Sequence, residues 1–180
     1  MKRKIFISLN LPKQTKKRLS KAIEEWDDLP VKWTKEDNLH ITLLFLGFVD
    51  DDAAFEISEK VVFAVKDFEI FDIEFDSIGL GPDENDPKMI WLIGKENKEL
   101  LALIEKLEKE LGIFTRAKKG FRPHITLGRI RKQKWDDLPE KPKVSKGLPL
   151  IVTAESVDVM ASDFEGGSTE YAMVESCPLQ

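Results

Sequence analysis

The stretch His40-Ile41-Thr42-Leu43 recurs unchanged as His124-Ile125-Thr126-Leu127, and the two copies contain the only histidines of the chain. Successive side chains of a β-strand point to opposite faces of the sheet. Each copy therefore places an imidazole beside a hydroxyl and directs its isoleucine and leucine to the other face. The duplicated motif indicates two related lobes. We expect the two motif strands to face each other across a central cleft, where one substrate can touch both His/Thr pairs.

The first half of the chain alternates between strand and helix patterns. The predicted elements are a strand at residues 4–9, an amphipathic helix that opens at 11–12 and ends at 29–30, a strand at 38–49, a helix at 53–65, an alternating strand at 71–76 and a loop at 79–87. The long apolar run at 38–49 predicts a strand that is buried on both faces. This strand carries the first histidine.

The second half repeats the alternation. The predicted elements are a strand at 89–94, a helix at 97–111 that Gly112 ends, a strand at 121–130, a mobile loop at 132–149, and strands at 151–160 and 169–176 on either side of a Gly166-Gly167 turn. This order predicts an α+β fold with two pseudo-symmetric lobes of mixed or antiparallel β-sheet, helices packed outside and a central cleft. We expect residues 1–180 to form a single domain with two pseudo-repeated lobes.

The composition limits the classes of protein to consider. With 180 residues, of which 42% are hydrophobic, the chain is long enough to bury a core. No stretch approaches the roughly 20 apolar residues that span a bilayer, and the N-terminal segment turns polar by Asn10, too early for a signal peptide. Cys177 is the only cysteine, so no internal disulfide can form. We expect a cytoplasmic monomer that does not insert into a membrane.

The charges are distributed unevenly along the chain. The net charge of −5 argues against a protein that coats nucleic acid by bulk electrostatics. No acidic residue lies between Glu110 and Asp136, a segment that contains the basic residues Arg116, Lys118, Lys119, Arg122, Arg129, Arg131, Lys132 and Lys134. A run of charge usually forms a solvated face. Because this run surrounds His124, it also suggests a local phosphate site.

Two imidazoles suit in-line attack at phosphorus, because one can accept a proton from the nucleophile while the other protonates the departing oxygen. The ordinary histidine pKa of about 6.5 lets such a pair supply one neutral and one protonated ring near neutral pH. The hydroxyls of Thr42 and Thr126 would then hold the phosphoryl oxygens. The alternative is that both histidines are satisfied residues of the core, but their identical contexts favour catalysis.

Two arginines are candidate phosphate ligands. Arg129 follows the second motif, although simple alternation places it on the Ile125 face unless the strand twists or bulges. It could equally be a surface residue. Arg122 shares the parity of His124 and could bind phosphate or pair with a carboxylate. The sequence has no phosphate-binding loop for nucleoside triphosphates and no pattern that completes a metal site, so we expect neither a cofactor nor a metal.

With these motifs, the sequence resembles the RNA 2′,3′-cyclic phosphodiesterases, the 2′-5′ RNA ligase-like branch of the two-histidine (2H) phosphoesterases. The matching segments are residues 5–12, 31–33, 38–43, 45–47, 90–92, 121–129, 167–171 and 178–179. The resemblance implies a bilobal fold with His40, Thr42, His124 and Thr126 in the cleft. It implies hydrolysis of a terminal 2′,3′-cyclic phosphate to a 2′-phosphate by water.

The same resemblance implies a role for each group. His124 would be the base for water, His40 the acid for the leaving 3′ oxygen, and Arg129 a phosphate ligand. Phe6 stands where the family has an aromatic that contacts the terminal base, although Phe6 could equally belong to the core. The sequence departs from the family at residues 82–87, where relatives carry an Arg- or Pro-rich segment, which leaves substrate preference on that side open.

The expected partners are RNA 3′ ends, tRNA fragments among them, or 2′,3′-cyclic nucleotides. One alternative function is a module that binds RNA ends or nucleotides without turnover. A second is the reverse reaction, the joining of RNA ends through a 2′-5′ linkage, as a side activity of the same site. A third is a structural protein with two core histidines.

Overall fold

Two β-sheets, one for each copy of the repeated motif, form the framework of the chain. The computed structural model describes residues 2–113, 121–165 and 168–180. The four-stranded sheet has the order β3 (His40–Val49), β1 (Arg3–Asn10), β8 (Ser156–Glu165) and β9 (Ser168–Pro178). The five-stranded sheet has the order β2 (Val31–Trp33), β6 (His124–Ile130), β5 (Met89–Gly94), β4 (Phe71–Gly81) and β7 (Lys146–Ala154). The paired strands are antiparallel in both sheets.

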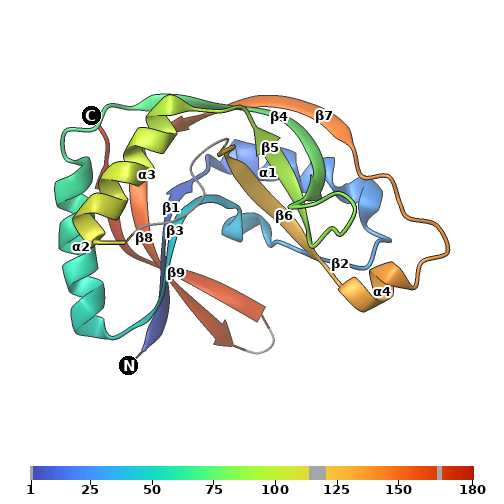
Figure 1. Ribbon diagram of the computed structural model, residues 1–180, viewed down its shortest axis with the longest axis horizontal. Coiled ribbons are helices and arrows are strands. Elements are labelled where there is room, and N and C mark those ends of the chain that lie inside the picture. The colour runs from blue at the N-terminus through green and yellow to red at the C-terminus, as the bar shows by residue number, and fades with distance from the viewer. Residues whose placement is uncertain (1, 114–120, 166–167) are drawn as a thin grey trace.

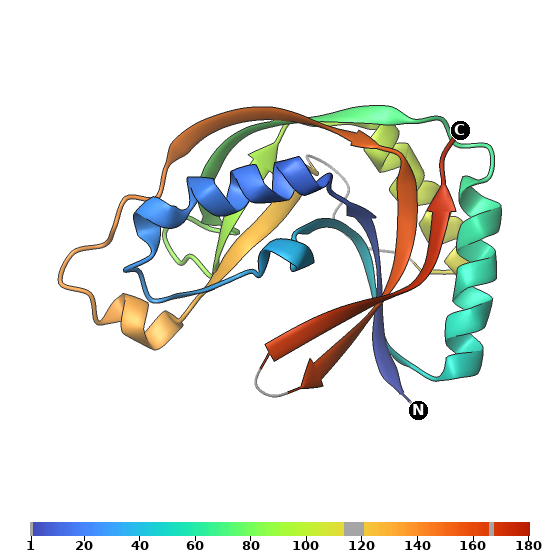
Figure 2. The same cartoon turned by 180° about the vertical axis from the view of Figure 1, so that it is seen from behind.

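The helices lie outside the two sheets. They are α1 (Lys13–Ala22), α2 (Asp51–Val65), α3 (Lys98–Leu111) and the short α4 (Lys132–Asp136), with 3-10 turns η1 (Glu24–Trp26) and η2 (Glu36–Asn38). The helices α2 and α3 lie side by side beside the four-stranded sheet, whereas α1 lies in front of the five-stranded sheet when seen from behind (Figures 1 and 2). This arrangement confirms the predicted α+β fold with two lobes and outer helices.

Local sequence explains where the helix α3 begins and ends. The side chain of Asn97 accepts a hydrogen bond from the backbone N–H of Leu100, which satisfies one free donor of the first turn. Its buried face presents leucines and one isoleucine at helical spacing. Gly112, with a φ of +67°, adopts the left-handed conformation that ends the helix. The predicted helix at 97–111 and its termination by Gly112 are therefore confirmed.

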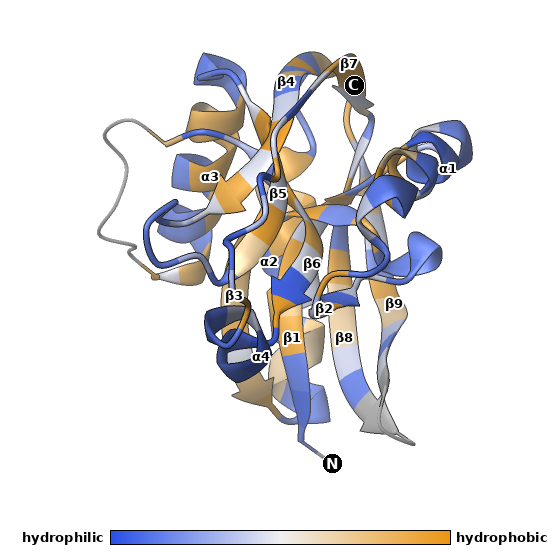
Figure 3. Ribbon diagram, turned by 90° about the vertical axis from the view of Figure 1, so that its right-hand side faces the viewer, coloured by the Kyte–Doolittle hydropathy of each residue, from blue (hydrophilic) through white to orange (hydrophobic). Residues whose placement is uncertain are grey.

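The hydrophobic core includes buried residues from both sheets and from the inner faces of the helices. Figure 3 shows hydrophobic segments along the strands of both sheets, whereas the outer helices α1 and α4 are mostly hydrophilic. In β4, Phe71, Ile73 and Phe75 are buried and alternate with more exposed acidic residues, as the sequence predicts. No helix in the described residues is long and apolar enough to cross a membrane.

Both motif strands contain a β-bulge at the leucine of the motif. The pairing of β1 with β3 skips Leu43, and the pairing of β5 with β6 skips Leu127. A bulge places two consecutive residues opposite one residue of the neighbouring strand, so the alternation of faces shifts by one position beyond it. Phe45 and Arg129, which lie two positions after the bulged leucines, therefore join the face of the histidine and threonine of their own motif.

Several sequence predictions of secondary structure are wrong. The strand at 38–49 is not buried on both faces, because Phe45 and Phe48 are 63% and 73% exposed. The loop predicted at 79–87 begins later, since β4 extends to Gly81. The helix predicted up to 29–30 ends at Ala22 and continues only as the turn η1. The short strand β2 was missed, because three residues are too few to show a pattern.

The C-terminal part differs more from the prediction. The segment 132–149 is not a loop throughout: it contains α4 and the start of β7, and the side chains of Trp135 and Val144 anchor it in the core. The strand predicted at 151–160 is two strands, which are separated at Glu155. The predicted Gly166-Gly167 turn and the basic residues Arg116, Lys118 and Lys119 lie outside the described residues.

Candidate active site

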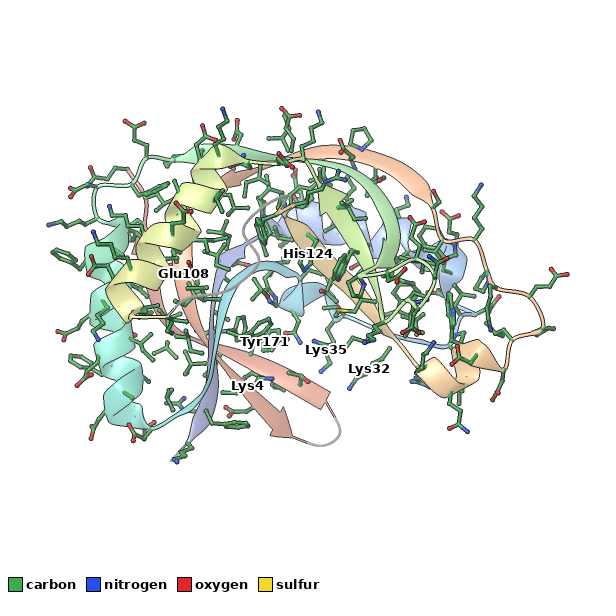
Figure 4. The ribbon with its side chains drawn as sticks, in the orientation of Figure 1. Lys4, Lys32, Lys35, Glu108, His124 and Tyr171 are labelled. Atoms are coloured by element: carbon green, nitrogen blue, oxygen red, sulfur yellow. The ribbon has the colours of Figure 1, made fainter. Side chains whose placement is uncertain are left out.

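The two motif copies line one pocket between the sheets, with a volume of about 300 Å³. Its wall contains both His/Thr pairs and Arg129, together with the pocket-lining residues Lys4, Phe6, Thr34, Phe45, Ser162, Thr169 and Tyr171. In Figure 4, His124 of β6 and Tyr171 of β9 lie on opposite sides of the space between the sheets. The predicted central cleft is thus present, and it brings His40, Thr42, His124 and Thr126 together.

Two hydrogen bonds fix the ring of His40. Its Nδ1 lies 2.6 Å from the backbone oxygen of Asn38, and its Nε2 lies 2.8 Å from Oγ1 of Thr42. A carbonyl oxygen only accepts hydrogen bonds, so Nδ1 carries the proton. In the neutral ring, Nε2 then accepts from the Thr42 hydroxyl. Asn38 is held in turn, because its Nδ2 donates to the backbone oxygen of Thr169 at 3.0 Å.

Aromatic rings surround His40. The ring centroid of Phe6 lies 5.1 Å away, and Tyr171 meets His40 edge-on with centroids 5.4 Å apart. Burial lowers the pKa of His40 below its ordinary value of 6.5, while the Asn38 carbonyl opposes this shift and the charge of Lys16 adds to it. His40 therefore gains its second ring proton only at a lower pH than a histidine in water does.

His124 has a similar environment in the other lobe. Its ring stacks on the indole of Trp91, with centroids 4.1 Å apart and an interplanar angle of 24°. Burial lowers its pKa from 6.5, and a hydrogen bond to the backbone of Arg122 opposes the shift. Each histidine is therefore oriented by the backbone of the residue two positions before it, Asn38 in one lobe and Arg122 in the other.

Arg129 lines the pocket on the same face as His124 and Thr126. Simple alternation alone would place Arg129 on the Ile125 face, but the bulge at Leu127, the exception that the sequence analysis allowed, turns it to the face of the pocket. Burial raises the pKa of Tyr171 from its ordinary value, and the positive charge of Arg129 acts against this rise. Both side chains line the pocket.

Arg122 does not line this pocket, so binding of phosphate, one of the two roles that the sequence left open for it, stays a prediction. Its Nε donates to the backbone oxygen of Gly94 at 2.7 Å, and its guanidinium lies 3.3 Å from a carboxylate oxygen of Asp76. The parity argument failed because β6 begins only at His124, so Arg122 lies before the regular alternation starts. The carboxylate pairing considered as the alternative is the one present.

Phe6 is 2% exposed and packs against both His40 and Tyr171. Its ring lines the pocket but mainly supports other side chains, and contact with a base stays a prediction. Sequence reasoning missed Tyr171, Lys4 and Phe45 as pocket residues. Tyr171 is the only tyrosine of the chain and lies in a segment that resembles the family, so the resemblance could have indicated it as a site residue.

The described residues contain no group of three or more His, Cys, Asp and Glu side chains that could hold a metal ion. The side chains that converge on the pocket include two imidazoles, several hydroxyls and one guanidinium. Such groups can donate hydrogen bonds to an anion and can exchange protons with it. The pocket is therefore suited to binding a phosphate group between two acid–base residues.

Comparison with known proteins gives consistent matches. Residues 9–91 match the model of the family described as LigT like Phosphoesterase. The RNA 2′,3′-cyclic phosphodiesterase of Thermotoga maritima is 29% identical, over 97% of this chain and 95% of that protein. The protein of the same name from Aeropyrum pernix is 36% identical, over 81% of this chain and 75% of that protein.

Solved structures share the fold. The structure of TT0787 of Thermus thermophilus aligns with a TM-score of 0.80 at 22% identity, over 98% of this chain and 97% of that one. The E. coli LigT complexed with 3'-AMP aligns with a TM-score of 0.75 at 22% identity, over 99% of both chains. The sequence matches show that the chain belongs to the LigT-like phosphoesterases of the two-histidine (2H) superfamily.

Proposed function

We propose that this chain hydrolyses the 2′,3′-cyclic phosphate at an RNA 3′ end to a 2′-phosphate. The observation that carries the proposal is the convergence of two His/Thr pairs and Arg129 on one pocket. The names of the curated relatives support the substrate class, since they are RNA 2′,3′-cyclic phosphodiesterases. The pocket joins donors for a phosphate anion to two groups that can exchange protons near neutral pH.

The proposed mechanism divides the proton transfers between the lobes. His124 accepts a proton from water as the water oxygen forms a bond to phosphorus. The bond from phosphorus to the 3′ oxygen breaks, and protonated His40 donates its proton to that oxygen. The product carries a 2′-phosphate and a free 3′ hydroxyl, and transfer of one proton from His124 back to His40 restores the enzyme.

The remaining groups act on the charge of the phosphoryl oxygens. The guanidinium of Arg129 can form charge-assisted hydrogen bonds to them, and the hydroxyls of Thr42 and Thr126 can donate to them. The phosphate is an anion, so its arrival favours the protonated form of a neighbouring histidine. This effect opposes the burial that lowers the pKa of His40.

The test incubates a short RNA that ends in a 2′,3′-cyclic phosphate with the purified protein in EDTA, and identifies the product phosphate. We expect a 2′-phosphate from the wild type, and a loss of at least about 10²-fold in kcat for His40→Ala and for His124→Ala. Circular dichroism checks that both variants fold, and Lys60→Ala at an exposed position of α2 is the matched control.

Wild-type protein that binds the RNA without converting it would overturn the proposal in favour of a binding module. Turnover that persists in both folded histidine variants would contradict the two-histidine mechanism. The expectations that the enzyme acts in the cytoplasm, as a monomer and as one domain stay predictions. The same holds for tRNA fragments as the source of the RNA ends.

A further inference from the structure

One residue next to β2, Thr34, binds the backbone of β6 at its bulge. The backbone N–H of Thr34 donates to the backbone oxygen of Leu127 at 2.9 Å, and its Oγ1 donates to the backbone oxygen of Thr126 at 3.0 Å. Thr34 follows directly after β2, the strand that pairs with β6, and it lines the pocket. A single residue therefore satisfies two consecutive carbonyl groups of the second motif.

These two carbonyl groups lie where the alternation of β6 shifts. In a regular strand, the carbonyl groups of consecutive residues point to opposite neighbouring strands. In β6 the pairing with β5 skips Leu127, and the oxygens of Thr126 and Leu127 both accept hydrogen bonds from the β2 side. A regular strand could offer only one of them to Thr34. The two hydrogen bonds therefore stabilise the bulged form of β6 relative to the regular form.

The packing of β2 adds a second contact at the same place. Trp33 lies opposite Gly128, the residue just before Arg129. A Cβ on Gly128 would lie 2.5 Å from Val31 and 2.8 Å from Trp33, so β2 lies directly against the backbone of β6. Close packing of this kind leaves the segment between the bulge and Arg129 little space in which to rotate.

The first lobe differs in this respect. In the part of the chain that the structure describes, β3 is the edge strand of its sheet, whereas β6 lies between β2 and β5. The residue two positions after the bulge is the neutral Phe45 in β3 and the charged Arg129 in β6. The bulge that has a supporting strand on its outer side is thus the one that presents a cation to the pocket.

The bulge decides whether Arg129 can reach a phosphate at all. Without it, Arg129 would share the face of Ile125, which is buried, and would not line the pocket. Paired hydrogen bonds from a guanidinium to a phosphate also require a defined orientation, and a displacement of about 1 Å can cost about 10²-fold in rate. A residue that fixes the backbone before Arg129 therefore affects how the phosphate is held without contact to it.

We propose that Thr34 is a positioning residue that stabilises the bulge of β6 and thereby holds Arg129 toward the substrate phosphate. The hydroxyl of Thr34 has one proton, which it donates to the backbone oxygen of Thr126, so it has no second proton to donate to the substrate. Thr34 acts on the reaction through Arg129. This proposal rests on the proposed function, because it explains how the phosphate of that substrate is held.

The experiment compares Thr34→Val, which retains the shape of the side chain but lacks the hydroxyl, with Thr34→Ser, which retains the hydroxyl. The matched control is Thr153→Val, because the Thr153 hydroxyl also donates a hydrogen bond, to Asp72, but lies in β7 outside the pocket. Titration with inorganic phosphate gives the dissociation constant of the anion, and hydrolysis of the cyclic phosphate gives kcat/KM.

We expect Thr34→Val to weaken phosphate binding by about tenfold and to lower kcat/KM by a similar factor, since it loses one hydrogen bond at the bulge. Thr34→Ser and Thr153→Val should both remain close to the wild type. Equal losses in Thr34→Val and Thr34→Ser would overturn the role of the hydroxyl.

A double-mutant cycle with Arg129→Ala identifies the group through which Thr34 acts. In the Arg129→Ala background, Thr34→Val should change kcat/KM by less than about twofold, because the guanidinium that Thr34 positions is already absent. An undiminished loss in this background would show that Thr34 contacts the substrate or has a general structural role, and would overturn the proposal.

Phosphate binding needs no turnover, so it separates this proposal from the proposed function. A wild type that binds phosphate but does not hydrolyse the RNA would contradict the proposed function alone. A folded Thr34→Val protein that binds phosphate as tightly as the wild type would overturn the role of Thr34. Urea unfolding checks the fold of each variant, and Thr34→Ala, which lacks the same hydroxyl, replaces Thr34→Val if that variant does not fold.

Discussion

Trp91 lies across the β-ladder from Thr126, and its indole supports the face of the His124 imidazole. The contact fixes one face of the imidazole and excludes water from it. Two features therefore depend on one neighbour: the orientation of the ring and the burial that lowers its pKa. Trp91 is a positioning residue, since it acts on the reaction through His124.

Replacing Trp91 with leucine should lower kcat by about tenfold to 100-fold, because the imidazole loses the surface that orients it. The pKa of His124 should rise toward 6.5 as water reaches the ring, which NMR titration of the ring proton can follow. Trp91→Phe retains a flat surface and should restore most of the activity. If both variants lowered kcat equally with no change in the His124 titration, Trp91 would have only a structural role.

The pH dependence of hydrolysis should be bell-shaped, because the reaction needs one neutral and one protonated histidine. Burial lowers the pKa of both His40 and His124 from 6.5. The free enzyme with a single proton on the pair is most populated between two values that both lie below 6.5. We therefore expect the maximum of kcat/KM below about pH 6.5, measured in EDTA, whereas an optimum above about pH 7 would contradict it.

The same shifts predict how stability depends on pH. The unfolded chain binds protons at its two histidines near pH 6.5, but the folded chain binds them only at lower pH. The free energy of unfolding should therefore fall as the pH decreases from about 7 through the lowered pKa values. Urea unfolding of the wild type and of a His40→Gln/His124→Gln variant at about pH 5 and about pH 7.5 isolates this contribution. Equal pH dependence in both proteins would contradict it.

The two arginines near the second motif should differ in their effect on activity. Arg129→Ala should lower kcat/KM by about 10²- to 10³-fold because it removes a charged donor to the phosphate, and Arg129→Lys should restore only part of the loss. Arg122→Ala should leave kcat/KM near the wild-type value, since its guanidinium contacts Gly94 and Asp76 outside the pocket. The assay is cyclic phosphate hydrolysis, and equal losses in both alanine variants would contradict this assignment.

A methyl group at Gly128 should destabilise the fold. A Cβ at this position would lie 2.5 Å from Val31 and 2.8 Å from the ring of Trp33. Overpacking of this kind costs about 1–3 kcal/mol, which thermal or urea unfolding of Gly128→Ala can measure. Gly147→Ala is the matched control, because nothing lies within 4 Å of its Cβ. Unchanged stability in Gly128→Ala would show that β2 moves away without cost.

The sequence predicted the parts of the site that depend on local alternation. His40 and Thr42 share a face because they lie two residues apart in a strand, and the same holds for the second copy. The long helices were also predictable, since their apolar spacing and caps are local. The prediction that the two motif strands line one cleft followed from the repetition of the motif, because the only two histidines of the chain both lie in it.

The remaining features depend on contacts between distant segments. The bulge at Leu127 is a property of the pairing of β6 with β5, so the sequence of β6 did not determine the face of Arg129. Trp135 is buried only because the fold brings the segment around it back to the core, against the local polarity that suggested a loop. Tyr171 reaches the pocket from β9, which is far from both motifs along the chain.

The paired bulges also fix a sequence spacing that can be used to search other sequences. The distance of five residues from each histidine to the side chain that shares its wall is set by one skipped leucine. Deletion of either leucine would restore strict alternation, so the residues that follow would exchange the face of the pocket for the opposite face of the sheet. A search for distant members of this architecture should therefore keep the spacing of five residues from each histidine. It should allow the residue at that position to differ in chemistry, from guanidinium to phenyl.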